Sequence, residues 1–401
     1  MTDAILAINA GSSSIKFALY EIGDHDAAKL IACGQIEGIG VAPHFTARDA
    51  HGHGLAEQRW ADPHTDHETL LTPLLDWVEA HLDGDDLIAV GHRVVHGGRH
   101  FLGPVLLTRA ILEELDALTP LAPLHEPHNL SPVRAIQALR PNLPQIACFD
   151  TAFHHTMPTV ATRFALPRDY EAEGVRRYGF HGLSYDHIAR VLRKEEPALA
   201  DARVIAAHLG NGCSLCAMQG GRSIDMTMGF TALEGLVMGT RCGSIDPGVL
   251  LYMMQERHLD ADAIEHLLYS ESGLLGLSGE SSDMRVLLES KRPEAAEAIE
   301  LFVYTIGREA AALASSLGGL DGFVFTAGIG EHAAPIRAAV CARLAWLGVV
   351  IDAAANDAGA QVISALDSRV RVLVIPADEE ATIVRDVLGI LRATAAEKAT
   401  P

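Results

Sequence analysis

A strand, a glycine-containing turn and a second strand occur twice in this chain, about half its length apart. The first copy spans residues 4–20, with its turn at 10–14, and the second spans 204–218, with its turn at 210–212. Short apolar runs that are bounded by glycine turns are typical of buried strands. Because the same plan recurs, we predict an α/β chain built from two similar halves.

The spacing of apolar residues predicts the remaining elements. Further strands are expected at 29–36, 54–60, 86–95, 144–149, 322–326 and 370–375. Helices are expected at 66–82, 246–257, 261–270, 294–317, 333–346 and 378–391. The last residues, 393–401, are expected to fray.

Composition and charge exclude several classes of protein. The chain has 401 residues, of which 49% are apolar, so a disordered chain is excluded and two or three domains are expected. The formal net charge of −21 argues against a nucleic-acid partner, because phosphate backbones repel an acidic surface. A small anion can still bind where a few Arg or Lys side chains are held locally.

Localisation also follows from the sequence. No run of 18 apolar residues is present, and no basic segment precedes an apolar stretch at the start. The six cysteines are scattered, as is usual in a reducing compartment. We therefore expect no membrane partner, no secretory signal and a cytoplasmic location.

Two groups of possible metal ligands carry little weight. Cys213 and Cys216 form a single C-x-x-C pair inside a predicted strand, so we interpret them as small strand residues. The spacing of a histidine-rich stretch matches no helical or finger-type metal site, and we expect an exposed loop there. Its histidines are His51, His53, His64 and His67.

Two glycine turns are candidate phosphate-binding elements, although the chain contains no P-loop motif. Gly328 to Ala333 fits a loose dinucleotide pattern but lies far from any leading βαβ unit, so we interpret it as a helix N-terminus that meets a nucleotide. Between Asn9 and Lys16, glycine and serines allow backbone amides to approach phosphate, and Lys16 adds a cation. A plain hairpin turn explains the Asn9–Lys16 segment equally well.

Four further residues are candidates for chemistry. Arg93 and Arg241 each lie beside glycines, where a guanidinium can make forked contacts with a carboxylate or phosphate. Asp150 follows a predicted strand directly, and His181 lies in a glycine-flanked turn. Taken singly, each has a structural alternative: a salt bridge for the arginines and a hydrogen-bonded turn for the histidine.

Together, these segments resemble the acetate kinase family of short-chain carboxylate kinases. The matching segments run in family order along nearly the whole chain: INAGSSSIKF (8–17), GHRVVHGG (91–98), APLHEPHN (122–129), FDTAFHHTMP (149–158), YGFHGLSYDHI (178–188), AHLGNGCS (207–214), GFTALEGLVMGTRCGSIDPG (229–248), SGESSDMR (278–285), FTAGIGEH (325–332) and IPADEEATIVRD (375–386).

This resemblance implies a fold and an assembly. The fold would be two duplicated ribonuclease-H-like domains of the actin and sugar-kinase superfamily around a central cleft. Residues 1–150, completed by a closing helix at 378–393, would form the N-terminal domain, and 151–377 the nucleotide-binding domain. The resemblance also implies a homodimer.

The resemblance also assigns roles to individual residues. Asp150, His181 and Arg241 would be catalytic, with His181 and Arg241 on the transferring phosphoryl group. The carboxylate substrate would meet Arg93, Val95, His125 and Ala232. Asn9 and Glu379 would hold Mg²⁺, or alternatively Mn²⁺. The ATP site would comprise Ser12, Ser14, Lys16, His208, Leu209, Gly210, Asn211, Gly212, Asp283, Met284, Arg285, Gly328, Ile329, Gly330, Glu331 and His332.

The implied reaction is the reversible transfer of a phosphoryl group from ATP to acetate, giving acetyl phosphate and ADP. Acetate is already an anion at neutral pH, so no general base is needed, and we expect Asp150 to orient an arginine or a metal-bound water. Ala232 stands where the family usually has proline, and this smaller residue is expected to admit propionate. A propionate or butyrate kinase is therefore one alternative. A non-enzymatic, actin-like nucleotide-binding regulator is another, although such a protein needs no pair of arginines for a carboxylate.

Overall fold

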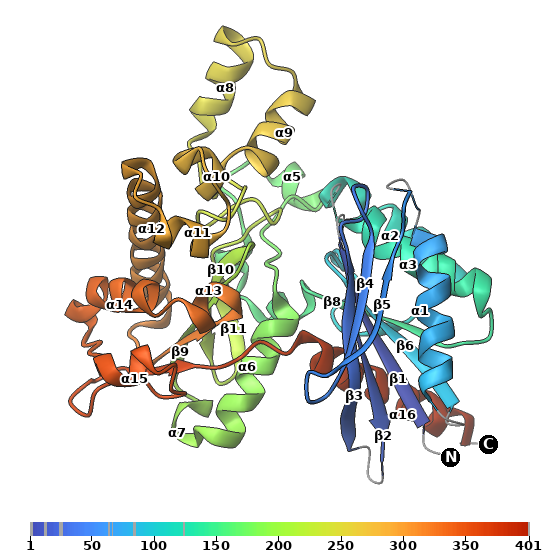
Figure 1. Ribbon diagram of the computed structural model, residues 1–401. Coiled ribbons are helices and arrows are strands. Elements are labelled where there is room, and N and C mark those ends of the chain that lie inside the picture. The colour runs from blue at the N-terminus through green and yellow to red at the C-terminus, as the bar shows by residue number, and fades with distance from the viewer. Residues whose placement is uncertain are drawn as a thin grey trace. The chain divides into compact units, whose positions relative to one another are not determined.

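The chain folds into two compact units, shown in the computed structural model of Figure 1. The first unit contains the chain up to Phe153 together with the segment from Asp378 onward, and the second contains His154–Ala377. The structure describes residues 3–11, 14–23, 27–62, 65, 67–82, 86–122 and 125–399. Ser12, an expected ATP-binding residue, and His64 lie outside the described residues.

The first unit is built on a mixed sheet with the strand order β5-β4-β3-β2-β1-β6-β8-β7. β1 pairs antiparallel with β2 and parallel with β6, and β6 pairs parallel with β8. The strands are β1 (Asp3–Ala10), β2 (Ser14–Ile22), β3 (Ala28–Glu37), β4 (His44–Asp49), β5 (Gly54–Arg59), β6 (Asp86–Val94), β7 (Val105–Leu106) and β8 (Gln145–Phe149).

Helices cover both faces of this sheet. On one face α1 (His67–His81) buries its leucines against β1 and β2, and α3 (Glu126–Leu139) packs beside it. On the other face lies α16 (Glu379–Ala399), so close that a Cβ at Gly91 would lie 2.3 Å from Ile383 Cγ2. The unit also contains α2 (Arg109–Asp116) and short 3₁₀ turns at Thr119–Leu121 and Ala152–Thr156.

The second unit repeats the plan of the first. Its sheet has the order β11-β10-β9-β12-β13, with β9 antiparallel to β10 and parallel to β12. The strands are β9 (Arg203–Leu209), β10 (Cys213–Gln219), β11 (Arg222–Met226), β12 (Gly322–Thr326) and β13 (Arg371–Val374). In both units the first strand joins an antiparallel hairpin to a parallel pair, which confirms the predicted duplication.

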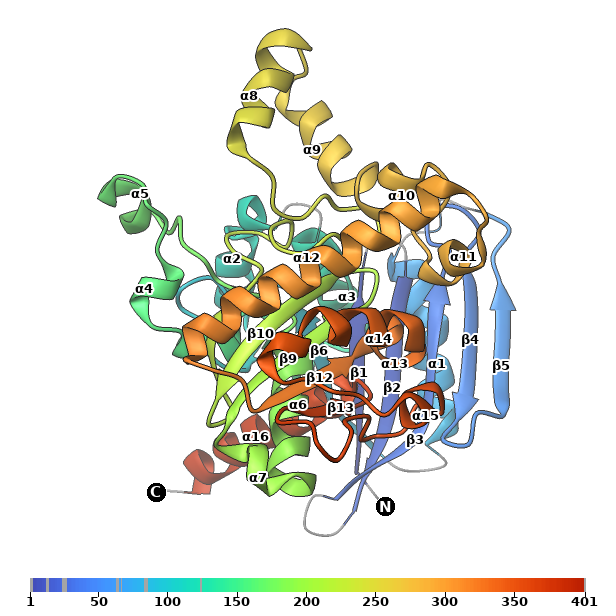
Figure 2. The ribbon, with the colours of Figure 1, turned by 90° about the vertical axis from the view of Figure 1, so that its left-hand side faces the viewer.

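The second unit is mainly helical outside this sheet. The long helix α12 crosses the sheet, and α8 and α9 project from the rest of the unit (Figure 2). Its helices are α4 (Thr159–Thr162), α5 (Arg168–Ala172), α6 (Gly182–Glu195), α7 (Pro197–Ala200), α8 (Pro247–Glu256), α9 (Ala261–Ser270), α10 (Gly273–Ser278), α11 (Met284–Glu289), α12 (Pro293–Leu317), α13 (Ala327–His332), α14 (Ala334–Arg343) and α15 (Ala353–Asp357), with a 3₁₀ turn at Ala345–Leu347.

The helix predicted at 333–346 differs from the observed one. Helical structure begins at Ala327, directly after β12, and is interrupted at Ala333 before α14. The interruption has a physical cause, because Pro335 has no N–H to donate to a carbonyl of the preceding turn. Arg337 Nη1 donates instead to the carbonyl oxygens of Gly330, at 3.0 Å, and Glu331, at 2.7 Å.

Two minor sequence expectations can be compared with the structure. Cys213 and Cys216 are buried residues of β10, as predicted. His51 and His53 lie exposed at the turn between β4 and β5, where Asp49 accepts hydrogen bonds from both of their backbone N–H groups. Among the residues that the structure describes, no helix has both the length and the apolar composition needed to cross a bilayer.

Candidate active site

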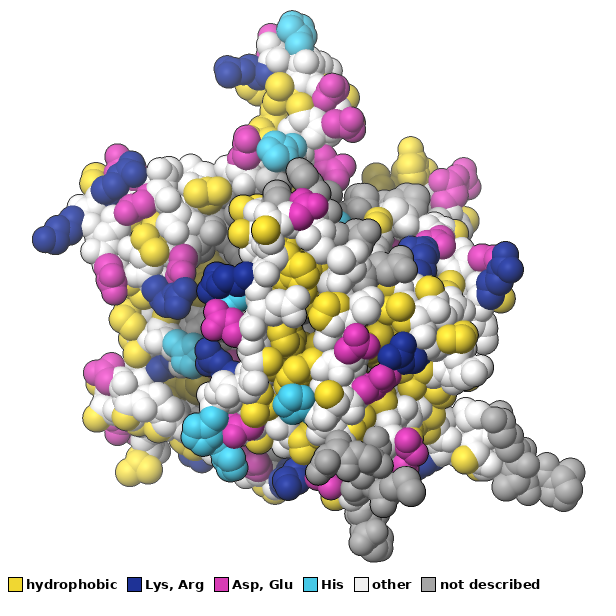
Figure 3. Space-filling model, turned by 45° about the vertical axis from the view of Figure 1, so that its right-hand side comes forward, with side chains coloured by type: hydrophobic (Ala, Val, Ile, Leu, Met, Phe, Trp, Pro, Cys, Tyr) yellow, Lys and Arg dark blue, Asp and Glu magenta, His cyan; other side chains and the backbone are white. Residues whose placement is uncertain are grey.

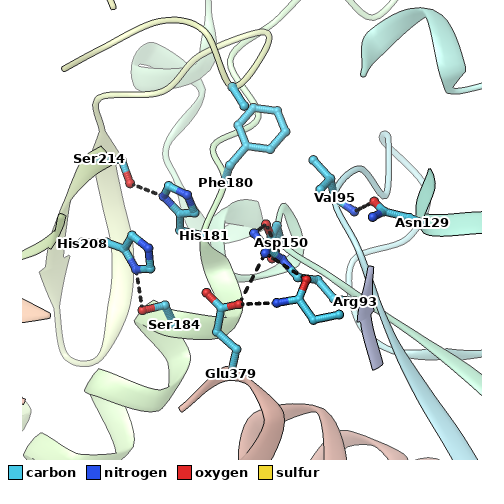
Figure 4. Close-up of polar contacts among 12 residues, drawn as sticks. Arg93, Val95, Asn129, Asp150, Phe180, His181, Ser184, His208, Ser214 and Glu379 are labelled. Atoms are coloured by element: carbon cyan, nitrogen blue, oxygen red, sulfur yellow. Dashed lines mark hydrogen bonds and ion pairs between the residues drawn. The ribbon is translucent and has the colours of Figure 1, made fainter. Parts of the chain in front are cut away.

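In the first unit, four polar side chains meet at the carboxyl ends of the central strands. Arg93 lies near the end of β6, Asp150 directly follows β8, Asn9 lies near the end of β1, and Glu379 begins α16. The Arg93 guanidinium donates from Nη2 to Asp150 Oδ2 at 2.6 Å and from Nε to Asp150 Oδ1 at 3.0 Å. This forked contact fixes the plane of the guanidinium (Figure 4).

The other end of the guanidinium faces Asn9 and Glu379. Arg93 Nη1 donates to Asn9 Oδ1 at 3.2 Å and lies 3.5 Å from Glu379 Oε2, while Asn9 Nδ2 donates to the same Glu379 oxygen at 3.2 Å. Burial lowers the pKa of Arg93, but the carboxylates of Asp150 and Glu379 outweigh it and raise the pKa above its usual value. Arg93 is therefore a permanent, oriented cation.

Asn129 ties the ends of two of these strands together. Its Oδ1 accepts a hydrogen bond from the backbone N–H of Val95 at 2.9 Å, and its Nδ2 donates to the carbonyl oxygen of Ala10 at 2.6 Å. Val95 is buried beside this contact, and His125 lies immediately before α3. Sequence reasoning assigned Asn129 no role, although it lies inside one of the matching segments.

The hairpin turn between β1 and β2 borders the same strand ends. Asn9 is paired with Lys16 across the hairpin, and the carbonyl oxygen of Ser14 accepts a hydrogen bond from the N–H of Gly11 at 2.8 Å. The structure thus places Asn9, Lys16 and Ser14 on one hairpin.

In the second unit, His181 and Arg241 lie beside one glycine turn. A Cβ added to Gly212 would lie 3.0 Å from Arg241 Nη2 and 3.2 Å from His181 Nε2. Arg241 Nη1 donates to the carbonyl oxygen of Ala232 at 2.6 Å, which holds the guanidinium. Two nitrogen atoms with hydrogen-bonding capacity therefore flank a space that glycine leaves open, an arrangement that suits an anion.

The imidazole of His181 is held from several sides. His181 has a left-handed backbone (φ 58°), which is rare outside glycine, and its ring stacks on His208 with centroids 4.1 Å apart. His181 Nδ1 lies 2.8 Å from Ser214 Oγ, and His208 Nδ1 lies 2.9 Å from Ser184 Oγ (Figure 4). The sequence analysis assigned no role to either serine.

A pocket of about 460 Å³ brings together the three segments expected to bind the nucleotide. It is lined by Gly210, Asn211, Ser282, Asp283, Met284, Arg285, Leu288, Gly328, Ile329, His332, Ala333 and Pro335. Asp283 caps α11 and forms an ion pair with Arg285 at 2.6 Å. Ala327, at the start of the α13 turn, has a left-handed backbone (φ 64°).

Some of the expected ATP-binding residues do not line this pocket. His208 and Leu209 end β9, Gly212 faces Arg241 and His181, and Gly330 packs near Phe325. Glu331 Oε1 accepts a hydrogen bond from the backbone N–H of Ala377 at 2.9 Å. Glu331 therefore has a local structural contact that its sequence position did not indicate.

Asn9 and Glu379 form a donor set that suits a hard divalent cation. Their amide and carboxylate oxygens both face Arg93 Nη1 and lie on adjacent elements. Within the described residues, no group of three or more His, Cys, Asp and Glu side chains could hold a metal. Mg²⁺ commonly binds one or two carboxylates, several waters and substrate phosphates, so a two-residue donor set fits it.

Comparison with known proteins places these residues in context. A sequence profile of the Acetokinase family matches residues 4–385. Acetate kinase of Rhodopseudomonas palustris is 54% identical over 391 residues, covering 96% of this chain and 98% of its own. Acetate kinase of Methylocella silvestris is 48% identical over 404 residues, covering 99% of this chain and all of its own.

Two solved structures of carboxylate kinases are similar to this chain over nearly its full length. A propionate kinase from Francisella tularensis superposes with a TM-score of 0.89 at 36% identity, covering 96% of this chain and 98% of its own. Porphyromonas gingivalis acetate kinase superposes with a TM-score of 0.84 at 36% identity, covering 97% of this chain and all of its own.

Proposed function

Because this chain belongs to the acetokinase family of carboxylate phosphotransferases, we propose that the residues described above transfer the γ-phosphoryl group of ATP to acetate, giving acetyl phosphate and ADP. One observation supports the roles that we assign to Arg241 and His181. The Gly210–Gly212 turn borders the nucleotide pocket on one side and the nitrogen atoms of Arg241 and His181 on the other. ATP in the pocket would therefore present its phosphates to two hydrogen-bonding groups.

The acceptor is held by Arg93 in this proposal. Acetate is an anion at neutral pH, since model carboxyl groups titrate at about pH 4, so no proton has to be removed before attack. The barrier comes from bringing one anion to another, and positive charge lowers it. Arg93 supplies that charge, and Asp150 orients the guanidinium through its forked contact rather than accepting a proton.

The transferring group is stabilised by Arg241 and His181. Charge spreads over the equatorial oxygens of the phosphoryl group in the transition state, where an oriented arginine contributes roughly 10³-fold or more to the rate. Arg241 is held by the carbonyl of Ala232 and so needs little reorganisation. His181 donates a hydrogen bond from Nε2 beside it.

Asn9 and Glu379 would hold Mg²⁺, or Mn²⁺ in its place. A divalent cation bound there would neutralise phosphate charge, which is the chemistry it supplies in phosphoryl transfer generally. Lys16 and Ser14 on the adjoining hairpin would contact the phosphates. Asp283 and Arg285 would lie near the adenosine, and the α13 turn near the α-phosphate.

Propionate is a second acceptor in this proposal. Ala232 stands where the family usually has proline, and an alanine leaves more room for the methyl group of the acid. One methylene in an apolar pocket changes the binding free energy by only about 1–3 kcal/mol, so the preference for acetate would be graded.

A homodimer in the cytoplasm completes the proposal. None of the described residues of α8 is buried, yet Leu251, Tyr252 and Met254 are apolar and 52–55% exposed. Figure 3 shows apolar side chains beside charged ones on the projecting α8–α9 segment at the top. A second copy of the chain would cover this surface. The six cysteines, all of them free thiols, suit a reducing compartment.

The experiment is a hydroxamate assay with ATP, Mg²⁺ and each of acetate, propionate and butyrate. We expect the largest kcat/KM with acetate, a smaller value with propionate, and losses of roughly 10³-fold in Arg241→Lys. Arg203→Lys is the matched control, because Arg203 pairs with Asp321 outside the site. ATP binding without product from any acid would overturn the proposal and favour a nucleotide-binding regulator.

A further inference from the structure

A chain of buried hydroxyl groups leads to the imidazole of His181. Tyr185 lies on α6, fully buried, and its Oη is 2.5 Å from Ser214 Oγ on β10. Ser214 Oγ is in turn 2.8 Å from His181 Nδ1. Ser214 is also fully buried, so the chain is shielded from solvent.

The direction of these hydrogen bonds follows from the protonation state of Tyr185, the first residue in the chain of hydroxyl groups. Burial raises the pKa of Tyr185 well above its usual value, so the phenol keeps its proton. A tyrosine hydroxyl has one proton to donate, and Ser214 Oγ is the nearby acceptor. Ser214 then has one proton of its own, which is directed at His181 Nδ1.

We propose that Tyr185 and Ser214 are positioning residues that hold His181 in the tautomer with its proton on Nε2. Because the Nδ1 atom accepts a hydrogen bond, the ring proton of the neutral imidazole lies on Nε2, the nitrogen beside Gly212 and Arg241. His181 is thereby a donor toward the space between them. The catalytic consequence rests on the proposed function, whereas the tautomer itself does not.

The same arrangement opposes protonation of the ring. An imidazolium needs an acceptor at Nδ1, but the Ser214 hydroxyl donates there as long as Tyr185 occupies its acceptor side. Arg241, whose Nη2 lies beside the same glycine, adds a positive charge that also disfavours an imidazolium. His208, whose ring stacks on that of His181 with centroids 4.1 Å apart, is another titratable neighbour.

The first test measures the tautomer directly, without any substrate. In protein labelled with ¹⁵N-histidine, the ring nitrogens of His181 are assigned from the signals lost in His181→Gln. We expect an N–H signal for Nε2 and a bare-nitrogen signal for Nδ1 in the wild type. Exchange between both tautomers in the wild type, or a proton on Nδ1, would overturn the proposal whatever the enzyme acts upon.

The second test asks whether the hydroxyl groups act through His181. Tyr185→Phe and Ser214→Ala should each lower kcat on the order of tenfold, less than the roughly 10²- to 10³-fold loss expected when a donor is removed outright. KM for ATP should stay within about twofold, and the acid limb of the pH–kcat profile should move to higher pH. Ser214→Thr, which keeps the hydroxyl, should restore activity.

Tyr178→Phe is the matched control. Tyr178 is also buried, but its hydroxyl donates to the carbonyl oxygen of Gly174 at 2.8 Å, away from His181. Its loss costs a buried hydrogen bond of similar strength and should leave kcat and the pH profile unchanged. If Tyr178→Phe and Tyr185→Phe gave equal losses with unshifted pH profiles, the hydroxyl of Tyr185 would have only a structural role and the proposal would fail.

Discussion

A single added methyl group at Gly212 should separate catalysis from nucleotide binding. Gly212 does not have a left-handed backbone, so Gly212→Ala imposes no conformational strain. The new Cβ would lie 3.0 Å from Arg241 Nη2 and 3.2 Å from His181 Nε2. Non-bonded heavy atoms prefer about 3.5–4.0 Å, so both nitrogens would have to retreat by roughly 0.3–0.5 Å or more.

The size of the effect follows from what these two groups do. The methyl group displaces both donors and also fills the space in which a phosphoryl oxygen would lie. Loss of one oriented donor typically lowers kcat by about 10²- to 10³-fold, equivalent to roughly 3–4 kcal/mol of transition-state stabilisation. We therefore expect Gly212→Ala to lower kcat at least a hundredfold, with KM for ATP changed only slightly.

The assay is ADP release with saturating ATP and acetate, together with ADP binding by calorimetry. Gly389→Ala is the matched control, because a Cβ there meets no atom within 4 Å. A folded Gly212→Ala protein with wild-type kcat would refute the placement of Arg241 and His181 at the reacting phosphoryl group. Loss of ADP binding with an unchanged kcat would also refute that placement.

Three other substitutions test separate parts of the structure. Burial raises the pKa of Glu126 from 4.5 to about 8, so between these pH values the folded state holds a proton that the unfolded state releases. The free energy of unfolding, measured with urea, should therefore fall as the pH rises from about 4.5 to 8. Glu126→Gln should flatten this pH dependence. Asp150→Asn removes the charge that orients Arg93 and should lower kcat by roughly 10²-fold in steady-state assays; wild-type kcat with unchanged Mg²⁺ dependence would exclude that role. Ala232→Pro should raise the acetate-to-propionate ratio of kcat/KM by about tenfold in a competition assay, and an unchanged ratio would remove this residue from the acid pocket.

Much of the fold could be predicted because local pattern and tertiary structure agree. The apolar runs on either side of the two glycine turns became β1–β2 and β9–β10, which are the centres of the two sheets. The interruption between α13 and α14 could not be predicted from the spacing of apolar residues. Pro335 has no N–H to donate, and the long side chain of Arg337 donates to the carbonyl oxygens in its place. Periodicity records which positions are apolar, and it does not record which carbonyl groups an arginine will reach.

Some residues of the candidate site could likewise be predicted from the sequence, and others could not. Arg93, Asp150, His181 and Arg241 could be singled out because charged residues beside glycines and strand ends are unusual, and family resemblance then assigned their roles. Ser214 gave no such signal. Its importance depends on the antiparallel register that pairs it with His208 and on its contact with His181, which are properties of the folded sheet.

The duplication explains why this fold can provide two different binding surfaces. In each unit, candidate residues lie at the carboxyl ends of parallel strands. Asn9 and Arg93 lie near the ends of β1 and β6, and Asp150 directly follows β8; His208 lies near the end of β9, and Gly328 follows β12 at the start of α13. Loops at that edge of an α/β sheet can change without disturbing the core. In our proposal, the first unit binds a carboxylate through the guanidinium of Arg93, and the second unit binds phosphates through its glycine turns. The shared sheet therefore accounts for where each group of residues lies, and the loops account for the difference between the two groups.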